Sequence, residues 1–213
     1  MLVVEVAVIG AVVLSVVMIA LGFAISGPLN SSVGHWDREA ASWFAHHRTP
    51  GFNTLTDAGT WFAETPVVVI GGAIAVALLA WKRSWHLFTV VAVGLLVEIS
   101  VFMIVELAVA RPRPPHGLEH RTTDSFPSGH VAASIVLYGA IAVIAWTLTT
   151  SRAVRAVTLL FAGVAPFVVA ASRVYRGMHH VSDAVGGLVL GAGCLAIALL
   201  AARRADAARP EPG

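Results

Sequence analysis

The stretch PSGHVAASIVLYGAIAVIAWTL (residues 127–148) decides the fold, because a short polar opening is followed by an uncharged apolar run from Val131 to Leu148. A helix needs about 20 mainly apolar residues to cross the roughly 30 Å hydrocarbon core of a bilayer. Five further segments have the same character: Leu2 to Ile25, Pro66 to Trp81, His86 to Ala110, Val154 to Ser172 and Val181 to Ala202. The sequence therefore predicts an all-α, polytopic membrane protein, built as a bundle of six transmembrane helices.

The composition of the whole chain supports this prediction. Of the 213 residues, 57% are hydrophobic and only 12% are charged, which is outside the ordinary range of soluble domains. The formal net charge is +2, and the basic residues form no stripe or run, which argues against a nucleic-acid partner. A single cysteine, Cys194, excludes an internal disulfide and a cysteine-based metal site.

We expect the first apolar segment to be a retained membrane helix. A secretory signal would have a basic segment before an apolar core of roughly 7 to 15 residues. The segment from Leu2 to Ile25 has no basic residue in front of it, carries Glu5 and is longer than such a core. Gly27-Pro28 then predicts the end of the helix.

A long loop, residues 26–65, separates the first two predicted spans. Its larger side chains recur at helical spacing: Trp36, Ala40, Trp43, Phe44 and His47. This pattern predicts a short amphipathic helix that lies in the membrane interface. The helix could anchor the chain or act as a lid over a site, and an anchor is the favoured interpretation.

Charge in the loops indicates an orientation. Lys and Arg residues divide equally between the two sides of the predicted bundle. On one side they share loops with most of the histidines, so a role in a functional site explains why these basic residues are there. We assign the other side to the cytoplasm by the positive-inside rule, which predicts cytoplasmic termini and an active site on the outer face. Residues 1–203 are expected to form one membrane-embedded domain, and residues 204–213 a disordered cytoplasmic tail.

The start of the fourth span has the features of an anion-binding site. A helix N-terminus presents unpaired backbone N–H groups and the positive end of the helix dipole. Pro127 suits such a start, and Gly129 would let a ligand approach the backbone closely. Ser128 could donate its hydroxyl to a phosphate oxygen, or it could simply cap the helix.

A histidine and a carboxylate open the sixth span. His179 and Asp183 are four residues apart, so on a helix they would share one face. A carboxylate that accepts from one imidazole nitrogen fixes the tautomer and leaves the other nitrogen free to attack. The alternative is an interfacial histidine beside an aspartate that favours the helix start. His180 would point about 100° away on a helix, so we expect no role for it.

Two arginines, Arg113 and Arg173, lie at the same predicted membrane face as these histidines. Each supplies a planar, permanently charged fork that suits a tetrahedral oxyanion. An arginine at a membrane edge can also serve as a headgroup anchor. The coincidence of two Arg, two His, one Asp and a helix start on one face favours a phosphate site.

These residues carry a resemblance to a known family. The sequence resembles the type 2 phosphatidic acid phosphatase superfamily, which has three signatures: Lys, six residues, Arg-Pro; then Pro-Ser-Gly-His; then Ser-Arg, five residues, His, three residues, Asp. The chain matches them, in order, at Arg113-Pro114, at Pro127 to His130, and at Ser172, Arg173, His179 and Asp183. The Lys position of the first signature is Glu106.

The resemblance implies a metal-independent phosphatase that needs no cofactor. It implies that His179 attacks phosphorus and forms a phosphohistidine, while Asp183 holds its far nitrogen. His130 would protonate the leaving oxygen and then activate water. The groups expected to bind the phosphate oxygens are Arg113, Arg173, Ser128 and the Gly129 N–H.

Glu106 is the one departure from the family pattern, because a carboxylate cannot replace a phosphate-binding ammonium. Arg111, about one turn away, could supply the missing charge. Glu106 could instead orient Arg111 or Arg113 through an ion pair. A lower activity or a different headgroup preference is the third alternative.

A lipid phosphate is the expected substrate, since the site would lie at the bilayer surface between apolar helices. The resemblance allows phosphatidic acid, phosphatidylglycerol phosphate or undecaprenyl pyrophosphate. Two other functions stay open: a phosphotransferase that uses the same phosphohistidine, and a noncatalytic protein that binds or transports lipid phosphates. An acceptor pocket in the long first loop would favour the phosphotransferase.

Overall fold

The structure is a computed structural model that describes residues 2–119 and 123–207. This part of the chain contains eight α-helices: α1 (Leu2–Ser26), α2 (Val33–His46), α3 (Pro50–Trp61), α4 (Thr65–Trp81), α5 (Trp85–Val109), α6 (Gly129–Leu148), α7 (Arg152–Tyr175) and α8 (Val181–Ala207). Six segments are long and apolar enough to cross a membrane, with α3 and α4 taken together as one of them. The predicted all-α architecture with six spans is confirmed.

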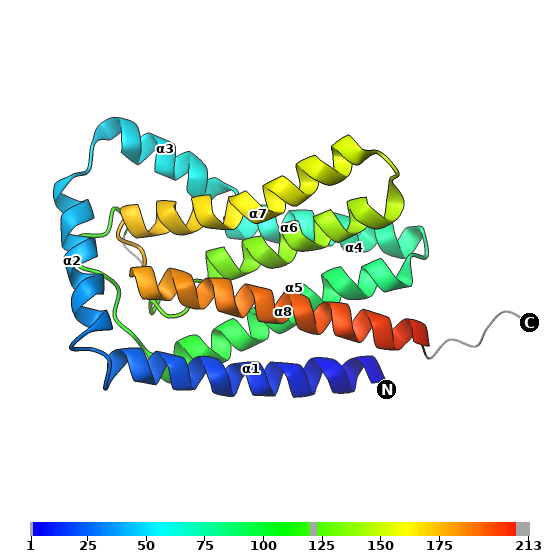
Figure 1. Ribbon diagram of the computed structural model, residues 1–213, viewed down its shortest axis with the longest axis horizontal. Helices are drawn as coiled ribbons and strands as arrows, with labels where there is room; N and C mark the ends of the chain where they lie inside the picture. Colours follow the sequence, from blue (N-terminus) through cyan, green and yellow to red (C-terminus); the bar gives the residue numbers. More distant parts are fainter. Residues whose placement is uncertain (1, 120–122, 208–213) are drawn as a thin grey trace, which may run out of the picture.

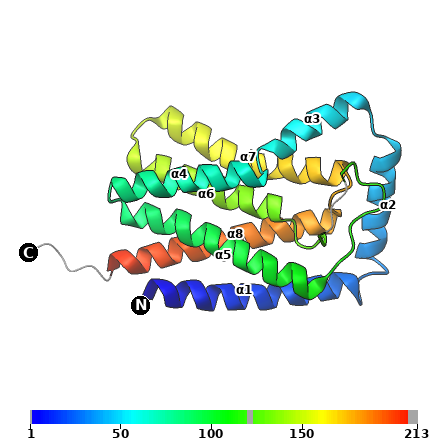
Figure 2. The ribbon, with the colours of Figure 1, turned by 180° about the vertical axis from the view of Figure 1, so that it is seen from behind.

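The long helices lie side by side, and the two ends of the bundle differ (Figures 1 and 2). The start of α1 and the end of α8 lie at one end, while α2 and the loop between α5 and α6 lie at the other. All the residues predicted to be catalytic or to bind phosphate lie at this second end of the bundle. An even number of spans brings the two ends of the described chain to the same side of the membrane.

Between α1 and α4 the chain forms two helices where one was predicted. Helix α2 is the predicted amphipathic helix, and it lies across the end of the bundle (Figure 1). Helix α3 was missed, although Thr49 and Pro50 carry a recognised start signal: the Thr49 side chain accepts a hydrogen bond from the Phe52 N–H at 3.3 Å, and Pro50 opens the first turn.

Helix α2 has one exposed aromatic face and one face against the bundle. Trp36 and Trp43 are 74% and 57% exposed, whereas Asp37 and Ala41 are buried. Exposed tryptophans suit a helix that lies among lipid headgroups. Because Asp37 pairs with a buried arginine of the bundle, α2 is fixed in place, which favours an anchor over a movable lid.

Close backbone contact joins α6 to α8. A Cβ atom at Gly187 would lie 2.5 Å from the carbonyl oxygen of Ser128, and one at Gly191 would lie 2.7 Å from that of Ala132. Small residues four apart allow membrane helices to approach in this way. The contact fixes the start of α6 against the first turns of α8, which is where the site residues lie.

The predicted tail is wrong in its first part. Helix α8 continues to Ala207, so residues 204–207 are helical. Asp206 pairs with the His86 imidazole at the start of α5, which ties the last turn of α8 to the bundle. The rest of the predicted tail, residues 208–213, lies outside the described residues.

Candidate active site

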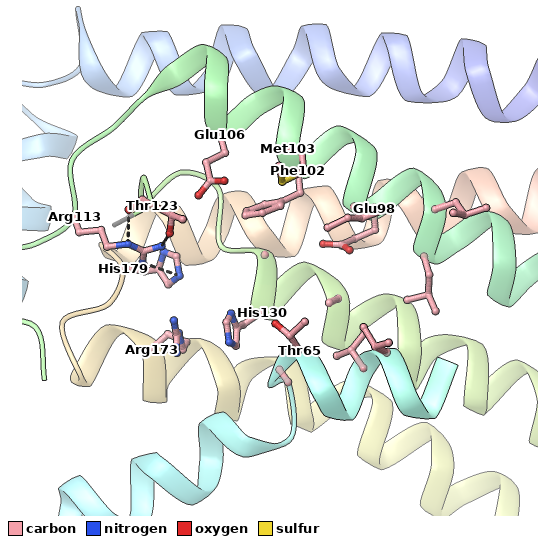
Figure 3. Close-up of a pocket in the computed structure, with 18 residues that line it drawn as sticks. Thr65, Glu98, Phe102, Met103, Glu106, Arg113, Thr123, His130, Arg173 and His179 are labelled. Carbon is pink, nitrogen blue, oxygen red and sulfur yellow. Dashed lines mark hydrogen bonds between the residues drawn. The ribbon is translucent and has the colours of Figure 1, made fainter. Parts of the chain in front are cut away.

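A cavity of about 490 Å³ lies between α4, α5, α6 and the end of α7 (Figure 3). Its lining has two parts. One end carries polar side chains: Glu106, Arg113, Thr123, His130, Arg173 and His179. The other part is mainly apolar and is lined by residues of α4 and α5, among them Val68, Val69, Leu96, Ile99 and Met103. The predicted catalytic histidines and both predicted phosphate-binding arginines therefore meet at one cavity.

His179 lies in the short turn between α7 and α8 and is 3% exposed. Its Nδ1 atom lies 2.8 Å from the carbonyl oxygen of Ser125. A carbonyl oxygen only accepts, so Nδ1 carries the proton and donates it in this bond. In the neutral ring Nε2 then carries the lone pair, and it accepts a long hydrogen bond of 3.5 Å from Nη1 of Arg113.

The surroundings of His179 keep its imidazole neutral. Burial lowers its pKa well below the usual value, and the charges of Arg173 and Arg113 lower it further, against an opposing effect of Asp183 and of the bond to Ser125. A neutral imidazole with one free nitrogen is the nucleophilic form of histidine. The geometry and the charge of this residue therefore suit attack on phosphorus.

The predicted contact between Asp183 and His179 is wrong. Asp183 is fully buried, but it accepts from the backbone N–H of His180 at 2.7 Å and lies 3.1 Å from the Nδ1 atom of that residue. The reason is the helix start: α8 begins at Val181, so His179 precedes the helix and does not share a face with Asp183. His180, for which no role was expected, is the direct partner of the carboxylate.

Arg111, one of the predicted phosphate-binding residues, pairs with two acidic side chains. It is buried, and its guanidinium lies between two carboxylates, contacting Asp183 through Nη1 and Asp37 through Nη2 at 2.8 Å. Arg111 is also absent from the lining of the cavity. Its charge therefore neutralises two buried acids and fixes α2 to the start of α8.

Asp37 is a site-supporting residue that the sequence analysis did not identify. Its carboxylate accepts from the backbone N–H of Ser182 at 3.0 Å and from the Ser182 hydroxyl. A buried aspartate on an otherwise amphipathic helix was the available signal, because a carboxylate is seldom buried without a partner. Together with Arg111 it holds the turn that carries His179.

Arg113 is held at the rim of the cavity by the neighbouring backbone. Its Nε donates to the carbonyl oxygen of Thr123 at 2.8 Å, Nη2 donates to the Thr123 hydroxyl at 2.9 Å, and Nη1 donates to the carbonyl oxygen of Met178. Met178 directly precedes His179 in the chain. The same guanidinium thus lines the polar end of the cavity and stabilises the turn that carries His179.

Glu64 is a second residue that the sequence analysis missed. It precedes α4, and its Oε1 atom lies 3.6 Å from Nε2 of His130 and 3.9 Å from Nη1 of the buried Arg173. The carboxylate therefore lies between the predicted acid and one predicted phosphate-binding cation. Its position directly before Thr65-Pro66, a helix start, was a signal for helix capping but not for this contact.

Ser128 and Gly129 open α6, as predicted. The Ser128 hydroxyl caps no N–H group, and its Oγ is buried without a hydrogen-bond partner in the described part of the chain. The simple capping alternative is therefore wrong. Gly129 lines the cavity, and a Cβ atom there would lie 3.0 Å from the ring of Phe102.

Comparison with known proteins agrees with this geometry. The model of the PAP2 superfamily matches residues 84–206, which is more than half of the chain. Phosphatidylglycerophosphatase B of Bacillus subtilis (strain 168) is 30% identical over 140 residues, which cover 64% of this chain and 66% of that protein. The Escherichia coli (strain K12) protein named "Putative undecaprenyl-diphosphatase YbjG" is 26% identical over 163 residues, covering 70% and 78%.

A solved structure has the same fold over nearly the whole chain. The crystal structure of a transmembrane PAP2-type phosphatidylglycerolphosphate phosphatase from Bacillus subtilis superposes with a TM-score of 0.72. The sequence identity is 25%, and the match covers 95% of this chain and 98% of the other. The six spans, the paired histidines at one cavity and the matched family model lead to one conclusion: the chain belongs to the PAP2 superfamily of membrane phosphatases.

Proposed function

We propose that this protein hydrolyses a lipid phosphate ester or diphosphate through a phosphohistidine on His179. The observation that carries the proposal is the state of that residue: a buried, neutral imidazole whose unprotonated Nε2 has only a long, 3.5 Å hydrogen bond from Arg113. The printed names of the relatives, "Phosphatidylglycerophosphatase B" and "Putative undecaprenyl-diphosphatase YbjG", are consistent with a lipid phosphate substrate.

In the first step Nε2 of His179 attacks phosphorus, and the bond from phosphorus to the leaving oxygen breaks. His130 lies across the cavity and gives its proton to that oxygen. The carboxylate of Glu64, 3.6 Å from Nε2 of His130, is placed to pair with the protonated ring. The products are the phosphohistidine and the free lipid alcohol or lipid monophosphate.

In the second step water attacks the phosphohistidine while His130, now neutral, takes the proton of the water. The phosphorus–nitrogen bond breaks, and its electron pair returns to Nε2 of His179, so both residues regain their starting form. The lining of the cavity includes only Ala63 and Thr65 from residues 26–65. This favours water over a second, protein-held acceptor in that segment.

Three kinds of group would stabilise the charge that develops on the phosphoryl oxygens. Arg113 and Arg173 line the cavity as permanent cations. The N-terminus of α6 adds the Gly129 N–H and the positive end of its dipole. The buried Ser128 hydroxyl, which has no partner among the residues described, can donate to an oxygen that reaches it.

The apolar part of the cavity supports a lipid tail as part of the substrate. Met103 and Ile99 line it on α5 and are 44% and 49% exposed. On α4, Val69 lines the cavity and is likewise exposed. A hydrocarbon chain could therefore extend from the phosphate end between α4 and α5 into the membrane.

The orientation follows from the positive-inside rule and remains part of the proposal. The cavity lies at the end of the bundle opposite to the start of α1 and the end of α8. With cytoplasmic termini, the phosphate would enter from the outer leaflet. Protease access to a tag at either terminus, in sealed vesicles of known orientation, would check this assignment.

Phosphate release by the purified protein tests the proposed function. The substrates are phosphatidic acid, phosphatidylglycerol phosphate and undecaprenyl pyrophosphate in mixed micelles. We expect release from at least one of them and its loss in His179→Ala, with His47→Ala as the matched control because that histidine, just after α2, is exposed and absent from the cavity lining. Equal release by His179→Ala and the wild type would contradict the mechanism.

A further inference from the structure

Glu106 is a buried acidic side chain in a cavity that is otherwise rich in cations. It lies near the end of α5, is 7% exposed and lines the same cavity as Arg113 and His179. Figure 3 shows its carboxyl group directed into this cavity. Its Oε1 atom has no hydrogen-bond partner among residues 2–119 and 123–207. A buried acceptor atom without a donor is unfavourable, so a ligand group that donates to it would be stabilised.

The nearby arginines are committed to other partners. Arg111 places its guanidinium between Asp37 and Asp183, so it does not pair with Glu106. Arg113 is a polar neighbour of Glu106, but it directs hydrogen bonds from all three of its nitrogens to Thr123 and Met178. The carboxyl group of Glu106 lines the cavity in which a substrate would lie, and the Thr123 side chain is its hydrogen-bonding neighbour.

A phosphate group cannot satisfy the Oε1 atom of Glu106. Its ionised oxygens only accept hydrogen bonds, and a carboxylate only accepts as well. The donor must come from another part of the substrate. An ammonium group would lie beside Arg113 and Arg173 and be repelled by them, whereas a neutral hydroxyl group would not.

Glu106 also lies at the depth where the alcohol part of a substrate begins. Phe102 is one turn away on the same face of α5, and it packs against Gly129 at the start of α6. Glu106 thus lies between the cationic end of the cavity and the apolar part beyond Phe102. The first atoms after the leaving oxygen would pass it.

We infer that Glu106 determines specificity by accepting a hydrogen bond from a hydroxyl group on the alcohol part of the substrate, close to the ester oxygen. This inference rests on the proposed function and narrows its substrate class. The terminal phosphate of phosphatidylglycerol phosphate is carried by a glycerol with such a hydroxyl. Phosphatidic acid and a polyprenyl diphosphate have none at this place.

A matched pair of substrates tests the inference: phosphatidylglycerol phosphate, and the analogue in which 1,3-propanediol replaces the phosphorylated glycerol, so that only the hydroxyl is missing. We expect the wild type to prefer the hydroxylated lipid by about tenfold in kcat/KM, since a hydrogen bond to a charged group discriminates by this order. Glu106→Leu should bring the ratio close to one, mainly by slowing the hydroxylated lipid. Glu106→Gln keeps an acceptor oxygen and should keep part of the preference.

The control is Glu39→Leu, which makes the same change on the exposed surface of α2 and should leave the ratio as in the wild type. A wild-type ratio of one, or an unchanged ratio in Glu106→Leu, would overturn the inference while the phosphatase activity stands. An equal fall for both lipids would also overturn it, because that result means that Glu106 only orients Arg113. Absence of phosphate release from every lipid by the wild type would overturn the proposed function and this inference with it.

Discussion

The Nδ1 atom of His179 donates to the carbonyl oxygen of Ser125 at 2.8 Å. This bond joins the turn before α8 to the segment before α6, so the two halves of the site share one hydrogen bond. Because Ser125 is held in turn by the backbone carbonyls of Arg111 and Pro112, the orientation of His179 depends on the loop after α5. The tautomer of His179 is thus set by the backbone and not by a carboxylate.

Loss of the Asp183 carboxylate should act through stability and position, not through direct loss of a partner of His179. Asp183→Asn leaves the buried Arg111 with one carboxylate in place of two. We expect a fall in the free energy of unfolding of about 3–5 kcal/mol, the usual cost of breaking a buried ion pair. Thermal unfolding in detergent measures this, with exposed Glu39→Gln as the control.

Asp37→Asn should resemble Asp183→Asn, because both carboxylates hold the same guanidinium. Its effect on kcat should accompany the loss of stability, since Asp37 also holds the Ser182 N–H in the first turn of α8. An Asp37→Asn protein as stable and active as the wild type would show that α2 does not support the site.

Arg113, which matches the first signature, and its neighbour Arg111 should respond differently to replacement by lysine. Arg113→Lys removes a planar fork at the cavity, so kcat/KM should fall by about 100-fold if two charge-assisted hydrogen bonds to the transition state are lost. Arg111→Lys should lower the melting temperature while the KM stays near the wild-type value, since this residue is absent from the cavity lining. Steady-state kinetics and thermal unfolding on the same preparations separate the two effects. A large rise in KM for Arg111→Lys would restore it as a phosphate ligand.

The acid limb of the pH profile should reflect His179. Burial and the charges of Arg173 and Arg113 lower the pKa of this imidazole well below its ordinary value. The neutral, nucleophilic form is present above that pKa, so kcat/KM should hold at mildly acidic pH and fall only well below about pH 6.5. In Arg113→Met one lowering charge is gone, and the limb should move to higher pH. If the acid limb of this variant lies at the same pH as in the wild type, or at a lower pH, the result would contradict the electrostatic explanation.

Gly187 and Gly163 form a matched pair for the contact between α6 and α8. A Cβ atom at Gly187 would lie 2.5 Å from the Ser128 carbonyl oxygen, whereas one at Gly163 on α7 would meet nothing within 4 Å. Gly187→Ala should lower the free energy of unfolding by about 1–3 kcal/mol, the usual cost of overpacking. It should also lower kcat, because Ser128 must shift to make room for the methyl group. Gly163→Ala should be neutral or slightly stabilising. Equal melting temperatures for the two variants would argue against the tight contact.

The spans could be predicted because hydropathy is a local property of the chain. Five of them lie within about five residues of their predicted bounds, whereas the second begins at Pro50 because α3 and α4 form it together. His130, His179, Arg113 and Arg173 meet at one cavity. Helix α3 was not predicted because polar residues interrupt its pattern of apolar residues, although Thr49 and Pro50 signal its start.

The partners of the site residues could not be predicted, because they depend on where helices begin and on contacts between distant segments. Asp183 does not hold His179 since α8 begins two residues after that histidine. Glu64 reaches His130 and Asp37 reaches Arg111 only through the packing of α2 and α4 on the bundle. No local sequence pattern predicts such contacts.

Trapping the phosphorylated enzyme tests the central claim most directly. The purified protein is mixed with a lipid substrate labelled with ³²P in its terminal phosphate, quenched within the first turnovers and mapped by peptide analysis. We predict an acid-labile, base-stable label on the peptide that contains His179, absent in His179→Ala and more persistent in His130→Ala, which lacks the group that activates water. Phosphate release at the wild-type rate with no label on His179 at any time, or the label on another residue, would contradict this account.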